Sequence, residues 1–306
     1  MHRLGQVAKR TTSRFKPNGW RVALAAGSLL VPVVTAQAEA VRPQFSRRLD
    51  APLLASGVAL TTIAIFASPE VRSVPDAGLD PAAIHLDFDR DIVGNRDVDA
   101  HTASDVLLYS ACAFPFALSF ASAPSGERWS ASLDRTVLFV ESLALAGGIT
   151  AVAKVVVSRP RPYTYLSISE RPDHSKYDVQ ASRAFESMPS GHATTTWCAA
   201  SFGVVDHVLT RPAADWKEHA AVGFAGGALA ASASVLRVEA GQHFPTDVLV
   251  GTGIGIAGGV TIPLLHRYVI GNEPAPSPSR DSWLAAAAGM AAGTVAVLLV
   301  NAAVGP

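Results

Sequence analysis

Three short segments of the sequence combine cations, histidines and a carboxylate at spacings that suit the binding and transfer of a phosphoryl group. The residues concerned are Lys154 and Arg161, then Ser190, Gly191 and His192, and finally Arg237, His243 and Asp247. Lysine and arginine can bind the non-bridging oxygens of a phosphate, and the planar fork of arginine matches their geometry. A histidine followed four residues later by an aspartate can act as an oriented nucleophile if both lie on one helical face.

Each segment by itself also has an ordinary structural explanation. Lys154 ends an apolar stretch and could extend to the surface, and Ser190 could cap a helix without binding a ligand. His243 could be a hydrogen-bonded histidine beside an aspartate at a helix start. The segments become informative together, because each of them falls at the end of an apolar stretch.

The elements that must position these residues are predicted to be helices. The apolar stretches cover residues 51–68, 106–126, 136–157, 193–205, 220–236, 248–265 and 283–306. They are too long and too rich in alanine for strands, and their glycine and serine content suits close helix packing. If consecutive helices run antiparallel, the three segments meet at one end of an all-α bundle. Backbone amides at the helix start near Ser190 would then add an anion-binding site.

The pattern Lys-x6-Arg-Pro, Pro-Ser-Gly-His and Arg-x5-His-x3-Asp resembles the type-2 phosphatidic acid phosphatase superfamily, which includes class A acid phosphatases and vanadium haloperoxidases. The match runs from Lys154 to Asp247. It implies an all-α helical bundle of the phosphatidic acid phosphatase and vanadium chloroperoxidase type, with about six core helices. One position departs from the pattern, because the family usually has serine before the third motif's arginine and this chain has Leu236.

The resemblance also implies a role for each motif residue. His243 would attack phosphorus, Asp247 would orient His243, and His192 would protonate the leaving oxygen and then activate water. A histidine with its usual pKa of about 6.5 suits that acid–base role. The residues that would bind the phosphate are Lys154, Arg161, Ser190, Gly191 and Arg237. Their three cations would take the place of a metal ion, so neither a metal nor another cofactor is expected.

Composition limits the classes of partner. The 306 residues include 25 basic and 25 acidic side chains, so the formal net charge is 0. Proteins that bind nucleic acids usually carry a basic excess, so no nucleic-acid partner is expected. The chain is 49% hydrophobic and 16% charged, well below the charged fraction of about 25% in soluble domains. This balance favours a membrane protein. Cys112 and Cys198 lie in apolar stretches, and we expect both to be buried.

The chain is predicted to consist of three parts. Residues 1–40 have basic residues before an apolar run and small residues at a cleavage-like spacing, which is typical of a signal peptide or targeting segment. The alternative is an uncleaved basic tail in the cytoplasm. Residues 41–272 would form the phosphatidic acid phosphatase-like domain, with its motifs at 154–247. Residues 273–306 would form a linker and a C-terminal apolar helix.

Two architectures remain open, a membrane-spanning bundle and a soluble periplasmic bundle. The short stretch 193–205 favours the soluble bundle, and the charge-free stretch 283–306 favours the membrane. Arg42, Arg47 and Arg48 lie on the same predicted side as the basic residues of three later loops, so with an uncleaved cytoplasmic N-terminus the positive-inside rule places the active site outside the cytoplasm. With a cleaved signal the site would face the cytoplasm if every stretch spans the membrane, and the periplasm if the domain is soluble. We therefore expect a bacterial cell-envelope protein, either in the inner membrane with an extracytoplasmic active site or in the periplasm.

The leading substrate is a phosphate monoester or diphosphate of a lipid or isoprenoid. The alternatives are a broad-specificity periplasmic acid phosphatase that acts on small phosphate esters, a vanadium haloperoxidase, and a non-catalytic membrane scaffold. The sequence indicates no oligomeric state.

Several polar residues outside the motifs have less specific interpretations. Asp87, Asp89 and Asp91 resemble a calcium loop, but Ile92 occupies the position that requires glycine, so a solvated loop is expected. Glu141 lies within an apolar stretch, where it would be functional in a membrane but could face water in a soluble bundle.

Some loop and aromatic residues are given ordinary roles. The loop residues His174, Lys176 and Arg183 are expected to be solvated, with recognition of a headgroup as the alternative. Trp197 and Phe244 are expected to be core residues.

Overall fold

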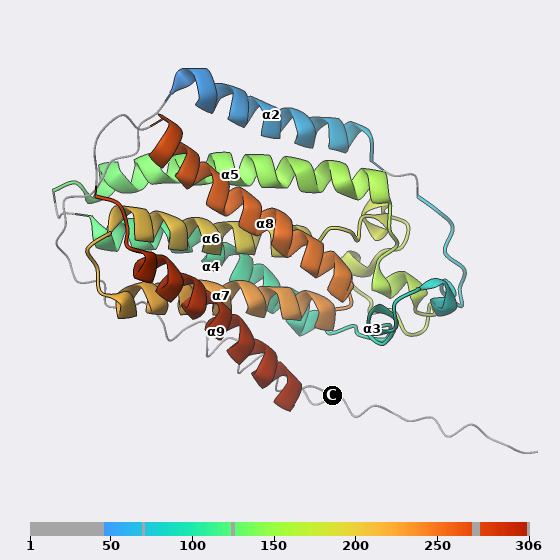
Figure 1. Cartoon of the computed structure of the whole chain (residues 1–306). Coiled ribbons are helices and arrows are strands. Elements are labelled where there is room, and N and C mark those ends of the chain that lie inside the picture. Colours follow the sequence, from blue (N-terminus) through green and yellow to red (C-terminus); the bar gives the residue numbers. More distant parts are fainter. Residues whose placement is uncertain (1–45, 69–70, 124–125, 271–275, 305–306) are drawn as a thin grey trace, which may run out of the picture.

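The computed structural model describes residues 46–68, 71–123, 126–270 and 276–304, and every regular element in these ranges is a helix (Figure 1). The long helices are α2 (Arg47–Phe66), α4 (Val98–Ser122), α5 (Arg128–Val157), α6 (Gly191–Thr210), α7 (Trp216–Glu239), α8 (Pro245–Leu265) and α9 (Arg280–Val304). The short ones are η1 (Pro81–Ala83), α3 (Asp87–Arg90), η2 (Pro162–Tyr165), η3 (Ser175–Tyr177), η4 (Ser182–Phe185) and η5 (His266–Ile270). The predicted all-α bundle is therefore confirmed. The predicted targeting segment at residues 1–40 lies outside the described residues.

The long helices from α4 to α9 alternate in direction along the chain (Figure 1). α4, α6 and α8 begin at one end of the bundle, where α5 and α7 finish, and we call this the site end. We call the opposite end the distal end. The three motifs follow α5, begin α6 and join α7 to α8, so the predicted convergence at one end is present.

α6 is the central helix of the bundle. It packs against α4, α5, α7 and α8, and nearly all of its side chains are buried, including Trp197, as predicted. Cys198 is buried as well, whereas Cys112 on α4 is half-buried. At 20 residues, α6 is about 30 Å long. It is thus longer than the apolar stretch 193–205 indicated, because its polar ends are buried against neighbouring helices.

Small residues allow α9 to pack closely against α7. An added Cβ at Gly223 or Gly227 of α7 would collide with the backbone of α9. An added Cβ at Gly289 or Gly293 of α9 would collide with the backbone of α7. Glycine at these four positions lets the two backbones approach one another, as in many membrane helix pairs. The C-terminal apolar helix is therefore packed into the bundle.

Six helices of the described chain, namely α2, α4, α5, α7, α8 and α9, are long and apolar enough to cross a membrane. Their outward faces carry large apolar side chains. Examples are Val58, Ile63, Ile65, Leu133, Val137, Val140, Ile149, Leu249, Ile256, Leu284, Val295 and Leu299. Apolar surface of this extent on a monomer usually contacts lipid or another protein. The helices are therefore compatible with a membrane protein.

Candidate active site

The turn between α7 and α8 places His243 at the site end. Gly241 adopts a φ of 62° in this turn, which glycine tolerates without side-chain strain. An added Cβ there would also collide with the backbone oxygen of Asn95. The amides of Gln242 and His243 close the turn by donating to the Arg237 carbonyl, at 3.1 and 3.3 Å. The His243 side chain is thereby held in a buried position beside the end of α7.

The two ring nitrogens of His243 have different environments. Nδ1 lies 2.7 Å from the Ser187 carbonyl oxygen, which can only accept a hydrogen bond. The neutral ring therefore carries its proton on Nδ1, and Nε2 carries the lone pair. Nε2 lies 3.4 Å from Nη1 of Arg161. The ring thus presents an unprotonated nitrogen beside a cation that could hold a phosphate.

Asp247 contacts His243 through Ser187 and not through a direct hydrogen bond. Its Oδ2 lies 3.7 Å from Nδ1 of His243, which is beyond hydrogen-bonding distance. The same oxygen accepts hydrogen bonds from the Ser187 hydroxyl at 2.5 Å and from the Phe244 amide at 2.8 Å. Ser187 therefore bridges the two residues, with its hydroxyl on the carboxylate and its carbonyl on the imidazole. The His-x3-Asp spacing predicted the proximity of the pair but not the bridge.

Arg159 binds the other oxygen of Asp247. Its Nη1 donates to Asp247 Oδ1 and to the Thr246 hydroxyl, both at 2.6 Å. Its Nη2 donates to Asp89 Oδ2 at 2.8 Å. The guanidinium also lies over the Phe244 ring, 4.0 Å from its centroid, and Phe244 is fully buried, as predicted. One arginine therefore compensates two carboxylates behind the predicted nucleophile.

Asp89 was predicted to lie in a solvated loop, and that prediction is wrong. The residue lies in α3, is 1% exposed, and accepts hydrogen bonds from the amide and hydroxyl of Thr246 at 3.1 and 2.6 Å. Its neighbour Asp87 is exposed, as expected. The sequence carried no signal for this burial, because Arg159 and Thr246 lie 70 and 157 positions away along the chain.

Lys154 lies beside the start of α6. Its Nζ donates to the Glu186 carbonyl at 2.6 Å. An added Cβ at Gly191 would lie 3.9 Å from the Lys154 Cε. The Ser190 hydroxyl accepts a hydrogen bond from the Ala193 amide at 3.4 Å, so this side chain serves as the N-cap of α6. The amides of Gly191 and His192, which precede Ala193, have no carbonyl partner within the helix and can face an anion.

Arg161 is held by backbone carbonyls on three sides. Nε donates to the Arg183 carbonyl at 2.7 Å, and Nη1 donates to the Gln242 carbonyl at 3.2 Å. Nη2 lies 3.5 Å from the Glu186 carbonyl. Because carbonyls are neutral acceptors, they orient the guanidinium without cancelling its charge. The charge remains available to an anion beside His243.

Arg237 is oriented by the first turns of α4. Its Nη1 donates to His101 Nδ1 at 2.6 Å and to the Ser104 hydroxyl at 3.2 Å. It also lies 3.8 Å from Asp105 Oδ1. Leu236, which stands where the family usually has serine, is 1% exposed in the apolar core. No polar contact is available from that position, and the residues of α4 orient the arginine instead.

His192, at the start of α6, pairs with Asp105. Its Nε2 lies 2.7 Å from Asp105 Oδ1, which as a carboxylate oxygen accepts the hydrogen bond. Nδ1 is then the nitrogen that can exchange a proton with a substrate. The His192 and Asp105 side chains are 21% and 36% exposed, whereas His243 and Asp247 are buried. The predicted acid therefore lies on the outer side of the site.

Burial lowers the pKa of both motif histidines. The pKa of His192 falls from its usual 6.5 to about 4, because burial and Arg237 outweigh the opposing effect of the hydrogen bond that His192 donates to Asp105. The pKa of His243 lies well below 6.5, first because of burial and then because of Arg161. Both rings are therefore neutral at pH 7 without a bound anion. The expected pKa of about 6.5 for His192 would require the negative charge of a bound phosphate.

Six residues of this site were missed or given no role by the sequence analysis. They are Asp89, His101, Asp105, Arg159, Ser187 and Thr246. His101 and Asp105 are four residues apart in the first turns of α4, which begins eight residues before the apolar stretch 106–126. That i,i+4 spacing is the one signal that could have identified them. The loop residues His174, Lys176 and Arg183 are exposed, as expected.

The comparison with protein families agrees with the motifs. Residues 135–270 match the family model described as the PAP2 superfamily, which confirms the resemblance to the type-2 phosphatidic acid phosphatases. This segment contains all eight predicted motif residues, whereas Asp89, His101 and Asp105 precede it. No curated protein and no solved structure matches the chain.

Proposed function

Since residues 135–270 match the model of the PAP2 superfamily, which includes phosphatases, we propose that this protein hydrolyses a phosphate ester through a phosphohistidine, with no metal ion in the active site. The tautomer of His243 carries the proposal. The hydrogen bond from Nδ1 to the Ser187 carbonyl leaves Nε2 as a nucleophile beside Arg161.

In the first step, His243 Nε2 attacks phosphorus and the bond from phosphorus to the ester oxygen breaks. The negative charge of the bound phosphate keeps His192 protonated on both ring nitrogens. Its Nδ1 gives a proton to the leaving oxygen, which keeps the electron pair of the broken bond. Arg161, Lys154 and Arg237 hold the non-bridging oxygens. Because backbone and side-chain contacts fix these cations before substrate binds, they stabilise the transition-state charge with little reorganisation.

In the second step, His192 accepts a proton from water, and the water oxygen attacks phosphorus. The bond from phosphorus to His243 Nε2 breaks, its electron pair returns to the ring, and inorganic phosphate leaves. The phosphorylated ring carries a positive charge, which the Ser187 carbonyl and the nearby Asp247 carboxylate stabilise. Asp105 holds His192 in the orientation that both proton transfers need.

The substrate we propose is a phosphorylated lipid or isoprenoid. Six helices in the described part of the chain are apolar enough to cross a membrane. The partly exposed pair of His192 and Asp105 lies where α4 turns apolar, and Val106 and Tyr109 beside it are 52% and 73% exposed. Tyr109 lies one turn beyond Asp105 on the same face of α4. An acyl or prenyl chain could follow this face while its phosphate enters the site.

We further propose that the site end faces away from the cytoplasm. Trp129, Trp216 and Trp283 lie in the first turns of α5, α7 and α9, all of which begin at the distal end. Tryptophan is enriched where helices leave a bilayer. Arg128 and Lys217 are adjacent to two of them, and basic residues favour the cytoplasmic side. The distal end would then be cytoplasmic and the active site extracytoplasmic.

The test is phosphate release by the purified full-length protein in EDTA, with a lipid phosphate in mixed micelles compared with a small aryl phosphate. His243→Ala should abolish release, whereas His85→Ala, at an exposed histidine, should not change it. Rapid quenching during turnover should trap a phosphorylated protein. Its bond to the phosphoryl group should be acid-labile and alkali-stable, as expected for phosphohistidine. His192→Ala should slow hydrolysis of the lipid phosphate more than hydrolysis of the aryl phosphate, because the aryl phosphate has a better leaving group.

Each competing function has its own outcome. Equal or faster release from the aryl phosphate would favour the soluble acid phosphatase. Halide oxidation that depends on added vanadate would favour the haloperoxidase. No turnover of any of these substrates by a folded protein would refute the proposal and favour the non-catalytic scaffold.

A further inference from the structure

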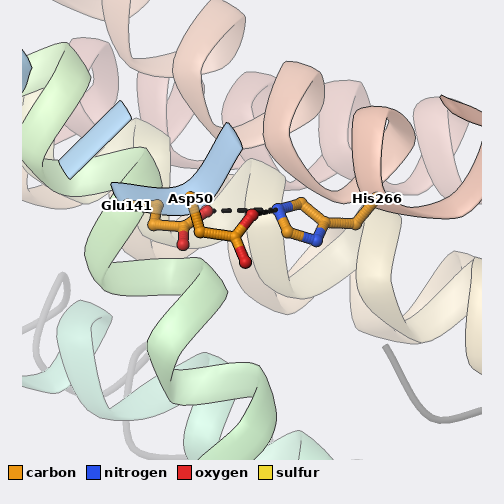
Figure 2. A group of neighbouring side chains, drawn as sticks. All are labelled: Asp50, Glu141 and His266. Carbon is orange, nitrogen blue, oxygen red and sulfur yellow. Dashed lines mark hydrogen bonds and ion pairs between the residues drawn. The ribbon is translucent and has the colours of Figure 1, made fainter. Parts of the chain in front are cut away.

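We propose that Asp50, Glu141 and His266 form a binding site for a divalent transition-metal ion, separate from the active site (Figure 2). The three residues come from α2, α5 and the turn η5 that follows α8. Glu141 precedes Lys154 by 13 residues on α5, so the cluster lies about 20 Å from the active site toward the distal end. No metal is expected in the active site, and this proposal concerns a different place in the fold.

The spacing of the three side chains suits a small ion. Figure 2 shows the two carboxylates directed at the same ring nitrogen of His266. Nε2 lies 3.1 Å from Glu141 Oε2 and 3.6 Å from Asp50 Oδ1. Ligands about 2.0–2.1 Å from a tetrahedral zinc ion are roughly 3.3 Å apart. These two separations lie on either side of this value, and the three ligand atoms all lie within 4.8 Å of one another. One ion could therefore contact all three residues after side-chain movements.

The hydrogen bonds of the cluster are incomplete. Nε2 of His266 can donate at most one hydrogen, and the nearer carboxylate oxygen that can accept it is Glu141 Oε2, at 3.1 Å. Within the described chain, Glu141 Oε1 and Asp50 Oδ1 are buried and have no hydrogen-bond partner. The residues are only 0% and 8% exposed, so water cannot readily replace the missing partners. Buried carboxylate oxygens are costly unless a hydrogen bond or a cation compensates them.

The charges of the cluster are also unbalanced. Asp50 and Glu141 both face the same imidazole, that of His266. The buried cluster therefore holds two acidic side chains and one basic side chain. A divalent ion bound by two carboxylates and a neutral imidazole would bring the total charge to zero. A metal ion therefore compensates both carboxylates, which a single histidine cannot do.

The surrounding helices hold the ligands in place. An added Cβ at Gly57 of α2 would collide with the backbone of Ala144 on α5, so these two helices are in close backbone contact one turn from Glu141. The Ser46 amide donates to Asp50 Oδ2 at 2.7 Å, which orients the carboxylate from behind. η5 is a π-helical turn, a form that is rare and frequent at functional sites.

The ligand set indicates the class of metal. Imidazole favours zinc, iron, copper and nickel, while carboxylates also accept manganese and magnesium. One imidazole with two carboxylates suits zinc or manganese, with zinc bound more tightly by the usual order of affinities. Three ligands from three helices would attach α2 to α5 and α8, so we assign the ion a structural role.

The test measures zinc in untagged full-length protein, stripped with chelator, incubated with Zn²⁺ and then dialysed in detergent. We expect about one equivalent of zinc in the wild type and less than roughly 0.2 in Glu141→Gln, which keeps the side-chain shape. The matched control is Asp87→Asn, at an exposed carboxylate, which should bind zinc like the wild type. Zinc should raise the thermal midpoint of the wild type and this control by at least about 3 °C, but not that of Glu141→Gln.

Two outcomes would overturn the proposal. One is a wild type that retains no zinc, and the other is equal zinc in the wild type and Glu141→Gln. If Glu141→Gln does not fold, Asp50→Asn at the edge of the cluster gives the same comparison. The proposal would also be refuted if His192→Ala lost the bound zinc while Glu141→Gln retained it, because the ion would then bind in the active site.

The metal proposal and the proposed function can fail separately. Phosphate release in EDTA is measured on the same preparations, because the ion takes no part in the reaction. Hydrolysis without specific zinc binding refutes the metal site alone. Zinc binding that needs Glu141, in a folded protein that releases no phosphate, refutes the proposed function alone.

Discussion

Replacing Arg159 by methionine tests whether one guanidinium supports the carboxylates behind His243. The substitution removes the charge that Asp247 and Asp89 share, at 2.6 and 2.8 Å. Both carboxylates are at most 1% exposed, so neither can turn toward water. Leaving a buried carboxylate without its cation costs about 3–5 kcal/mol, and loss of the contact with Phe244 adds about 0.5–1 kcal/mol. At about 2–4 °C per kcal/mol, the summed cost of about 3.5–6 kcal/mol should lower the thermal midpoint by roughly 7–24 °C.

The assay is thermal unfolding in detergent of the wild type, Arg159→Met, Asp89→Asn and the double variant. Because Asp89→Asn removes one of the uncompensated charges, the double variant should be more stable than the sum of the single effects by at least about 1 kcal/mol. Arg171→Met is the matched control, since Arg171 binds only loop carbonyls in the described structure, and its midpoint should change by less than about 2 °C. The reasoning would be refuted if the effects of Arg159→Met and Asp89→Asn were additive in the double variant. It would also be refuted if Arg159→Met lowered the thermal midpoint by less than about 2 °C.

Three further predictions concern proton transfer, pH and orientation. Asp105→Asn removes the carboxylate that orients His192 through a hydrogen bond to Nε2. Hydrolysis of an alkyl phosphate should therefore slow by roughly 10–100-fold, and that of an aryl phosphate much less. Equal losses of activity with the two substrates would contradict this role of Asp105. Burial lowers the pKa of His192 to about 4 and that of His243 well below 6.5, so the folded state binds fewer protons than the unfolded state. Thermal stability should therefore be full above about pH 6.5 and decrease as the pH falls toward 4, with a weaker slope in His192→Asn; a flat profile would contradict the shifts. In a cysteine-free background, Gln180→Cys at the site end should react with an impermeant maleimide on intact cells and Ala213→Cys at the distal end should not, whereas the reverse labelling would place the active site in the cytoplasm.

The burial of Glu141 shows how one ambiguity of the sequence is decided by packing. Its position within an apolar stretch was compatible with a functional group in a membrane or with a residue facing water. In the structure it is fully buried and faces Asp50 and His266 from two other helices. The water-facing interpretation is therefore wrong. The two partners are 91 and 125 positions away, and no local pattern relates them to Glu141.

The sequence by itself determined the all-α class and the eight motif residues at the site end. Helical periodicity, apolar length and motif spacing are local properties, and alternating helix direction brings the ends of α5, α6 and α7 together. Only the tertiary structure decided how the side chains of the site are paired. Ser187 bridges His243 and Asp247, and Asp105 binds His192, across 56 to 87 positions of sequence. Such contacts depend on where loops and helix starts pack in three dimensions, which short-range patterns in a single sequence do not encode.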